Sequence, residues 1–286
     1  MKILFITYDG LSDPLGQSQV LTYMVGLAQR GYKITIISTE KKSALNLQKG
    51  IGELLKRNNI EWHSISYTKK PQILSTLYDC FKLFLLARRL TKRERFNIVH
   101  CRSYIPALIG LHLKMRFGVK FIFDMRGFYA DERIDGRIWK QNRFLYRLLY
   151  KFFKRQERRF LTEADHTICL TERAKKEIWE WKIIPGQPIP IKVIPCCADM
   201  NTFDPLSIDE GRKKSLRQDA GIDQHDFVLM YMGAIGTWYM LDEMFDFFKR
   251  LLLVRPAKFM FITYDDPENI LKLARKKNIE IGRAHV

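Results

Sequence analysis

Charged and aromatic side chains crowd the end of one short apolar run near the middle of the chain. The run Phe121–Asp124 is typical of a buried strand, and Arg126, Asp131 and Glu132 follow it closely. An arginine can hold a phosphate group through two parallel hydrogen bonds, and a carboxylate can orient a sugar hydroxyl or act as a general base. Solvated ion pairs on a surface loop are the simpler interpretation. The aromatic content and the position after a strand nevertheless favour a binding site.

A second polar group follows the apolar run at residues 98–100. His100 and Arg102 stand at its end, where a parallel sheet would again present its ligand-binding edge. A lone histidine at such a place is slightly more often structural than catalytic. The sequence contains no Ser/His/Asp order with a nucleophile elbow, no HExxH and no paired Cys/His spacing. It therefore predicts neither a hydrolase triad nor a metal site built by the protein.

Two segments share the order strand, glycine loop, helix. Residues 2–30 show it first, and residues 227–253 repeat it around Gly233 and Gly236. A strand that passes through a glycine loop into a helix N-terminus can bind an anion. Neither loop is a G-x-G-x-x-G or a Walker A motif, so Glu40 after the second apolar run lacks the fingerprint of a dinucleotide site. This argues against a dehydrogenase and suggests a phosphate-bearing ligand in a cleft between two α/β domains.

The elements that must position these residues alternate between strands and helices. We expect strands at residues 3–8, 34–38, 61–65, 98–100, 121–124, 166–170 and 192–194. We expect helices at residues 17–30, 43–58, 72–94, 105–116, 138–163 and 172–181. This alternation predicts parallel pairing with helical crossovers, which makes a doubly wound, Rossmann-like sheet.

The domain organisation follows from the same pattern. Residues 1–195 are expected to form one complete domain, because prolines punctuate residues 183–208 and stop the helical pattern there. Residues 196–226 are expected to form a linker. Residues 227–279 supply two strands and two helices, which is about half of a second domain of this class. Residues 280–286 follow neither pattern, and we expect them to be a non-native tail on a natural protein that is longer.

Composition limits the class of protein further. The chain has 286 residues, 47% of them apolar, so a folded core is expected. Five scattered cysteines suit reduced thiols in a cytosolic protein better than a disulfide framework. No apolar run is long enough to span a membrane, and the N-terminus does not resemble a signal peptide. The formal net charge of +18 predicts attraction to polyanions.

Much of this charge lies in residues 137–159, where basic and aromatic residues are interleaved. A basic, aromatic-rich amphipathic helix can lie on an anionic membrane surface. The alternative is a long surface helix whose aromatic side chains face the core. Nucleic acid is the less favoured polyanion, because no nucleic-acid-binding motif is present.

Several stretches of this chain resemble glycosyltransferase family 4 proteins of GT-B architecture. They are Tyr8–Val20, Phe123–Asp135, Ala164–Glu172, Val193–Asp199 and Gly233–Met240. The resemblance implies two Rossmann-like domains, the first for the acceptor and the second for a nucleotide-activated sugar. It also implies that anomeric configuration is retained without a metal or other cofactor, because helix N-termini and basic groups stabilise the leaving diphosphate.

The resemblance assigns roles in the first domain. Asp124 and Arg126 would lie near the transferred sugar, and we group Glu132 with them as a candidate catalytic residue. Arg102 and Asp131 would face the acceptor.

The resemblance also assigns the donor site. Gly16 and Gln17 would lie beside the donor diphosphate, and Gly233, Gly236 and Thr237 would open the donor loop of the second domain. Two departures from the family pattern stand out. The family's E-x7-E segment normally lies well beyond the second strand of the second domain, and this chain has none there. The basic pair that usually follows the second glycine loop is replaced by Gly-Thr-Trp-Tyr.

The sequence thus predicts a C-terminally truncated glycosyltransferase. The full enzyme would transfer a hexose from a nucleotide sugar to a glycan or lipid-linked acceptor in cell-surface polysaccharide synthesis. It would be cytoplasmic or peripheral on the inner face of the membrane, and this chain alone would be inactive. One alternative is a non-catalytic basic α/β module that binds anionic membrane or nucleic acid. A nucleotide-sugar epimerase is disfavoured, because the glycine fingerprint and a Tyr-x-x-x-Lys pair are missing.

Overall fold

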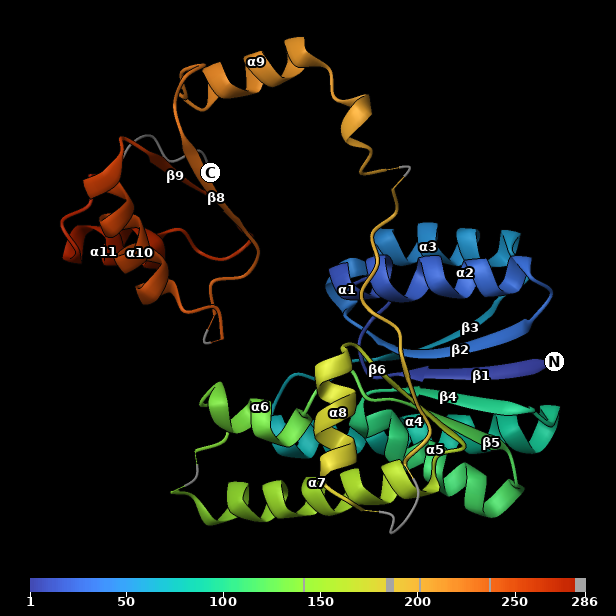
Figure 1. Cartoon of the computed structure of the whole chain (residues 1–286). Coiled ribbons are helices and arrows are strands. Elements are labelled where there is room, and N and C mark those ends of the chain that lie inside the picture. The colour runs from blue at the N-terminus through green and yellow to red at the C-terminus, as the bar shows by residue number, and fades with distance from the viewer. Residues whose placement is uncertain (141, 184–187, 201, 237, 281–286) are drawn as a thin grey trace. The chain divides into compact units, whose positions relative to one another are not determined.

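The computed structural model describes residues 1–140, 142–183, 188–200, 202–236 and 238–280. The chain divides into two compact units (Figure 1). Unit 1 comprises Met1–Ile134 and Trp139–Ala198, and unit 2 comprises Asp135–Ile138 and the chain from Asp199 onward. Each unit has its own sheet and its own core.

Unit 1 is built on a seven-stranded sheet with the strand order β3-β2-β1-β4-β5-β6-β7. The strands are β1 Lys2–Thr7, β2 Lys33–Glu40, β3 Glu61–Ser66, β4 Ile98–Arg102, β5 Lys120–Asp124, β6 His166–Cys169 and β7 Ile191–Val193. Every neighbouring pair is parallel, with Phe5 opposite Ile36 on one side and opposite His100 on the other. The predicted doubly wound parallel sheet is confirmed, and all seven expected strands are present.

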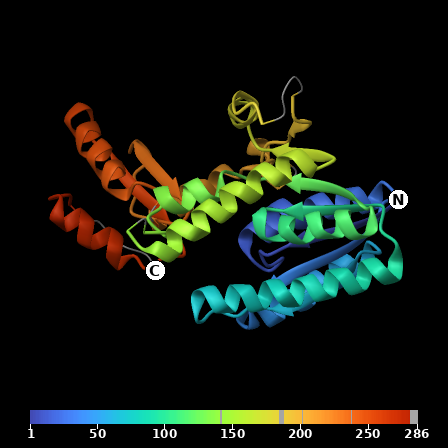
Figure 2. The same cartoon turned by 90° about the horizontal axis from the view of Figure 1, so that it is seen from below.

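Helices cover both faces of this sheet. They are α1 Pro14–Gly16, the π-helical η1 Gln17–Leu21, α2 Thr22–Gln29, η2 Lys42–Ala44, α3 Leu45–Arg57, α4 Gln72–Glu94, α5 Tyr104–Phe117, α6 Tyr129–Asp135, α7 Phe144–Glu163 and α8 Glu172–Glu180. Figure 1 shows α2 and α3 on one face and α4, α5 and α7 on the other. Figure 2 shows α4, α5 and α7 side by side on that second face.

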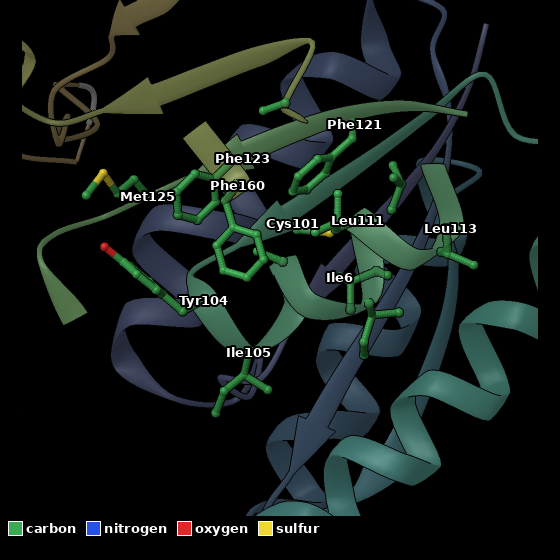
Figure 3. Packing of buried hydrophobic residues seen from close by; sticks show 14 of the residues in the cluster. Ile6, Cys101, Tyr104, Ile105, Leu111, Leu113, Phe121, Phe123, Met125 and Phe160 are labelled. Atoms are coloured by element: carbon green, nitrogen blue, oxygen red, sulfur yellow. The ribbon is translucent and has the colours of Figure 1, made fainter. Parts of the chain in front are cut away.

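The main core lies between the sheet and α5. Tyr104, Phe121, Phe123 and Phe160 are almost fully buried and pack edge to face or tilted against one another (Figure 3). Removing a buried phenyl ring such as that of Phe160 typically costs about 3–5 kcal/mol. This core fixes the position of β4 and β5, whose ends carry the polar residues singled out above.

Two sequence-based expectations about local structure are corrected. Residues 129–135, interpreted as a loop, form α6, because Ala130 is buried and the Tyr129 ring stacks on Tyr104. The helix expected from residue 138 begins at Phe144. Trp139 before it turns inward and is buried in the main core.

Unit 2 contains a small parallel sheet with helices packed on it. Its elements are η3 Pro205–Ser207, α9 Glu210–Asp219, β8 Val228–Met232, α10 Leu241–Val254, β9 Lys258–Ile262 and α11 Glu268–Lys276. Strands β8 and β9 pair in parallel, and Phe245, Ile270 and Ala274 form the centre of its core. None of the helices in the described part of the chain has the length and apolar content needed to cross a bilayer.

Candidate functional site

The carboxyl ends of β1, β4 and β5 lie next to one another and bring three predicted site residues together. Arg102 ends β4, Asp124 ends β5, and the two are paired in register. The Arg126 guanidinium lies 3.8 Å from the Asp124 carboxylate. Arg102 in turn donates to the carboxylate of Asp9, just beyond β1. This edge of a parallel sheet is where open α/β proteins bind ligands.

Gln19 connects the two arginines. Its side-chain oxygen, Oε1, accepts hydrogen bonds from Arg126 and, at 3.2 Å, from Arg102. Its Nε2 atom and the Arg126 guanidinium each lie 3.6 Å from the Cys196 sulfur. Sequence reasoning missed Gln19 and named Gln17 instead. Gln17 donates to the carbonyl oxygen of Ser12, within its own loop.

His100 belongs to the same group. It lies two residues before Arg102 on the face of the sheet opposite the main core, where its ring packs edge to face against Phe5. His100 Nε2 lies 3.7 Å from Asp124 Oδ2, and both side chains are buried. The signal in the sequence was the alternation His100-Cys101-Arg102, which puts the two polar side chains on one face and Cys101 in the core.

Three polar atoms of this group are buried and have no hydrogen-bond partner among the described residues. They are His100 Nε2, Arg102 Nε and Asp124 Oδ1. Buried polar atoms in proteins are almost always hydrogen-bonded, so an unpaired one needs an explanation, such as a bound water, ion or ligand. Three such atoms lie close together at adjacent strand ends, which makes this edge of the sheet a candidate for binding a polar ligand.

The backbone beside Asp124 is held in an uncommon conformation. Arg126 has a φ of 61°, a left-handed geometry that costs a residue with a side chain about 1–2 kcal/mol. Its guanidinium contacts to Gln19 and Asp124 hold it there. Strain of this kind is concentrated at functional sites. The local geometry therefore adds to the evidence for a site at the end of β5.

The first glycine loop is organised by Glu40, the last residue of β2. This buried carboxylate accepts hydrogen bonds from the backbone N–H groups of Leu11 and Ser12, at 2.7 and 3.2 Å, and from the Ser12 and Ser38 hydroxyls. Glu40 thus shapes the loop. Gly16 is also structural: a Cβ there would lie 2.0 Å from the carbonyl oxygen of Gly10.

Asp131 and Glu132 lie on α6, away from the strand ends. Asp131 accepts 2.8 Å hydrogen bonds from Tyr150 and from Lys154. Lys154 also contacts the buried Glu157, which accepts a hydrogen bond from Tyr104. Burial raises the pKa of Glu157, although the Lys154 ammonium and the Tyr104 hydroxyl oppose that shift.

This network reaches the strand end through Gly127. The Tyr104 hydroxyl lies 3.2 Å from the Gly127 carbonyl oxygen. A Cβ on Gly127 would lie 2.0 Å from the Glu132 carboxylate. Glu132 therefore lies beside the segment that carries Arg126, whereas Asp131 is engaged in holding α6 on α7.

The predicted donor loop lies in unit 2. Gly233 has a φ of 148°, which residues with a Cβ rarely adopt, and its N–H donates to the Ile262 carbonyl oxygen at 3.0 Å. Gly236 is exposed, and the Asp265 carboxylate accepts from the N–H of Ile235 at 2.7 Å. The prediction for Thr237 lies outside the described residues.

Comparison with known proteins identifies a family. The family model described as Glycosyltransferase Family 4 matches residues 16–202. This range includes Gln19, His100, Arg102, Asp124 and Arg126. A comparison with curated protein sequences finds no match.

Solved structures match over nearly the whole chain. A crystal structure of Anabaena HepE in complex with UDP and glucose gives a TM-score of 0.63 at 13% identity, covering 98% of this chain and 67% of that one. Sucrose-phosphate synthase from Thermosynechococcus elongatus gives 0.65 at 12% identity, covering 98% and 68%. UDP-GlcNAc 2-epimerase from Neisseria meningitidis, bound to UDP-GlcNAc, gives 0.52 at 11% identity, covering 100% and 73%.

These identities establish the fold alone, which is GT-B. The chain spans about two thirds of the length of the HepE and sucrose-phosphate synthase structures. Because an epimerase shares the fold, the fold does not by itself select the reaction. The family match over residues 16–202 is the more specific finding.

Proposed function

This chain belongs to glycosyltransferase family 4, and on that premise we propose that it forms part of an enzyme that transfers a sugar from a nucleotide diphosphate donor to a glycan or lipid-linked acceptor. The observation that carries the proposal is the group of buried polar atoms on His100, Arg102 and Asp124 that have no hydrogen-bond partner among the described residues. A polar ligand would satisfy them. The structural neighbours support a nucleotide sugar, since HepE binds UDP and glucose and the epimerase binds UDP-GlcNAc.

In this proposal the two arginines stabilise negative charge. The resemblance assigned Arg102 to the acceptor side, but it shares Gln19 with Arg126. We therefore propose that both arginines face the diphosphate as it leaves the sugar, where fixed cations stabilise developing charge most. Asp124 would position the sugar, and His100 beside it would hold a hydroxyl of donor or acceptor. Glu132 would help to hold the Arg126 segment, and Asp131 would act on the acceptor side.

The remaining parts of the proposal extend to the whole enzyme. We propose that the Gly233 loop of unit 2 binds the nucleotide, that configuration is retained, and that the reaction needs neither a metal nor another cofactor. We further propose a hexose donor, a cytoplasmic location and a role in cell-surface polysaccharide synthesis. The 286-residue chain alone is proposed to be inactive, and sugar transfer by it would overturn that statement.

The outward face of α7 supports contact with the cytoplasmic face of an anionic membrane. Phe144, Leu148 and Phe152 are exposed there among the basic residues of the segment 137–159, whereas Phe153 is buried in the core. The aromatic residues of α7 therefore divide between core and surface, and the exposed ones are those that could enter a membrane interface. Replacing Phe144 and Phe152 by serine should lower partitioning onto anionic vesicles severalfold, and unchanged partitioning would contradict the proposal.

Nucleotide binding tests the central proposal directly. The chain is titrated with UDP, GDP and ADP while its thermal unfolding is followed, with the matching nucleosides as controls. At tenfold excess over Kd a bound diphosphate adds about 1.4 kcal/mol, a rise in Tm of roughly 3–5 °C. We expect a rise with at least one diphosphate and none with its nucleoside. An equal response in Arg126→Gln and the starting chain would overturn the role of Arg126.

A further inference from the structure

Side-chain polarity is inverted along the first half of α4. Its outward face carries an apolar stripe at helical spacing, exposed by 46% to 66%: Leu74, Leu77, Tyr78, Phe81 and Leu85. The inward face of the same turns includes the buried polar residues Ser75 and Asp79. A contiguous exposed apolar patch of this kind marks an interaction site rather than an ordinary solvated helix.

The stripe leads into a cavity lined by cations. This cavity, of about 370 Å³, lies between the C-terminal ends of α4 and α5. Its lining consists of Leu85, Arg88, Arg89, Lys92, Arg116 and Phe117. None of these six residues is acidic. Arg93, next to them, pairs with Glu61 and Glu94, whereas in the described part of the chain none of the four lining cations forms an ion pair.

Complementing the helix dipole does not account for this cluster. Cations in the last turn of a helix offset its negative end, which explains Lys92 on α4 and Arg116 on α5. Arg88 and Arg89 lie before the last turn of α4, and their side chains converge with the other two on one cavity. Four cations without carboxylate partners around an open cavity call for an anionic ligand.

The cavity is separate from the candidate site described above. In a parallel sheet with helical crossovers, the helices run antiparallel to the strands. The C-terminal ends of α4 and α5 therefore lie at the edge where the strands begin. Arg102, Asp124 and Arg126 lie at the opposite edge. An anion bound in this cavity would accordingly be distinct from the nucleotide sugar.

We propose that the α4 surface, comprising the apolar stripe and the cation-lined cavity, docks on an anionic lipid bilayer. The apolar stripe inserts into the interfacial region of the bilayer, and the phosphate of a lipid headgroup enters the cavity. Charge favours this partner: from Leu74 to Arg93 no exposed position of α4 is acidic, and the chain carries a net charge of +18. The inference does not depend on sugar transfer. The outward face of α7 lies on the same side of the sheet, with α5 between (Figure 2).

Vesicle flotation of the 286-residue chain tests the proposal. The chain is mixed with phosphatidylcholine vesicles, with or without about a third of phosphatidylglycerol, at physiological salt. We expect flotation with the anionic vesicles only. Each cation near an anionic surface contributes about fivefold to partitioning. The variant Arg88→Gln/Arg89→Gln/Lys92→Gln should therefore partition at least tenfold less.

A matched control separates this surface from net charge. The variant Lys42→Gln/Lys49→Gln/Lys56→Gln removes the same charge from exposed positions of η2 and α3, which covers the other face of the sheet. Partitioning of this control variant onto anionic vesicles should stay within about threefold of that of the starting chain. A loss as large as that of the α4 variant would overturn the proposal. The variant Leu74→Ser/Leu77→Ser/Phe81→Ser tests the stripe. Its partitioning onto anionic vesicles should also fall at least tenfold, because binding no longer transfers three apolar side chains out of water.

Two further measurements distinguish a bilayer from other ligands of the α4 surface. Stabilisation of the chain by millimolar glycerol phosphate without flotation would overturn bilayer docking in favour of a soluble phosphate ligand. Salt-dependent binding of duplex DNA without flotation would overturn it in favour of nucleic acid. All substituted side chains are exposed, so thermal unfolding of each variant should match that of the starting chain. If the variant Leu74→Ser/Leu77→Ser/Phe81→Ser does not fold, the variant Arg88→Gln/Arg89→Gln/Lys92→Gln still tests the proposal.

Discussion

The carboxylate of Glu40 accepts hydrogen bonds from both the backbone N–H and the hydroxyl of Ser12. It is 3% exposed, so the charge is held almost entirely by protein donors. The N–H groups of Leu11 and Ser12 are occupied by this carboxylate. These two N–H groups are therefore already paired within the protein and are not free to bind a ligand.

Replacing Glu40 by Gln tests this role. The amide keeps the shape but loses the charge, and it turns one acceptor into a donor that faces other donors. We expect a loss of about 2–4 kcal/mol in the free energy of unfolding, measured with urea. Glu53→Gln, on the exposed surface of α3, should change it by less than about 0.5 kcal/mol. A small effect at position 40 would contradict the structural role.

Gly16 provides a second test of the same loop. A Cβ at this position would meet the Gly10 carbonyl oxygen at 2.0 Å and the Leu11 backbone at 2.7 Å. Because both contacts are backbone atoms, Gly16→Ala must displace the loop, and we expect a loss of at least about 2 kcal/mol by urea unfolding.

Gly26 is the matched control. It lies in α2, and a Cβ there would meet nothing within 4 Å. Gly26→Ala should therefore stabilise the chain by about 0.5–1 kcal/mol, because alanine has the higher helix propensity. Equal effects of the two substitutions would show that Gly16 is not sterically required.

The fold of unit 1 could be predicted because its signals are local. Runs such as Ile3–Tyr8 and Phe121–Asp124 are apolar and bounded by turns, and the helices between them have clear periods. The exceptions were set by tertiary contacts. Residues 129–135 became a helix because Tyr129 stacks on Tyr104, which is distant in sequence.

The site could be predicted only in part, for the same reason. Asp124, Arg126 and Arg102 end their strands, and strand ends can be read from the sequence. Gln19 could not be found in this way, because it reaches Arg126 from a π-helical turn after the glycine loop. The roles of Gln17 and Glu40 also depend on contacts within the folded loop.

Glu157 should make stability depend on pH. Its pKa in the folded chain is raised above the usual 4.5 by burial, although Lys154 and Tyr104 oppose the shift. The folded state therefore holds this proton more tightly than the unfolded state. The contribution of protonated Glu157 to the free energy of unfolding is fully present below about pH 4.5. It is lost as the pH rises through the pKa of Glu157 in the folded state.

The measurement compares the starting chain with Glu157→Gln by urea unfolding in a pH series. The difference in unfolding free energy should shift in favour of the variant as the pH rises above 4.5. Glu163→Gln, at the exposed end of the same helix, serves as control and should show no such trend. A shift in the opposite direction would mean that pairing with Lys154 outweighs burial.

The proposed site should bind a nucleoside diphosphate without a metal ion. In the proposed function, Arg102 and Arg126 supply positive charge that a metal ion would otherwise provide. The Tm shift produced by the diphosphate should therefore be the same in EDTA and in magnesium. A shift that appears only with magnesium would refute charge stabilisation by the protein alone.

Gln19 and Gln17 give the sharpest test of the site, since the sequence favoured one and the structure favours the other. Gln19 accepts from Arg102 and Arg126, whereas Gln17 donates to Ser12 in its own loop. Gln19→Ala frees both guanidinium groups to leave their positions. We expect diphosphate affinity to fall about tenfold, which corresponds to 1.4 kcal/mol. Gln17→Ala should change the affinity by less than about threefold while lowering stability slightly. If the two effects are reversed, the diphosphate lies beside the glycine loop and the arginine pair serves another part of the substrate.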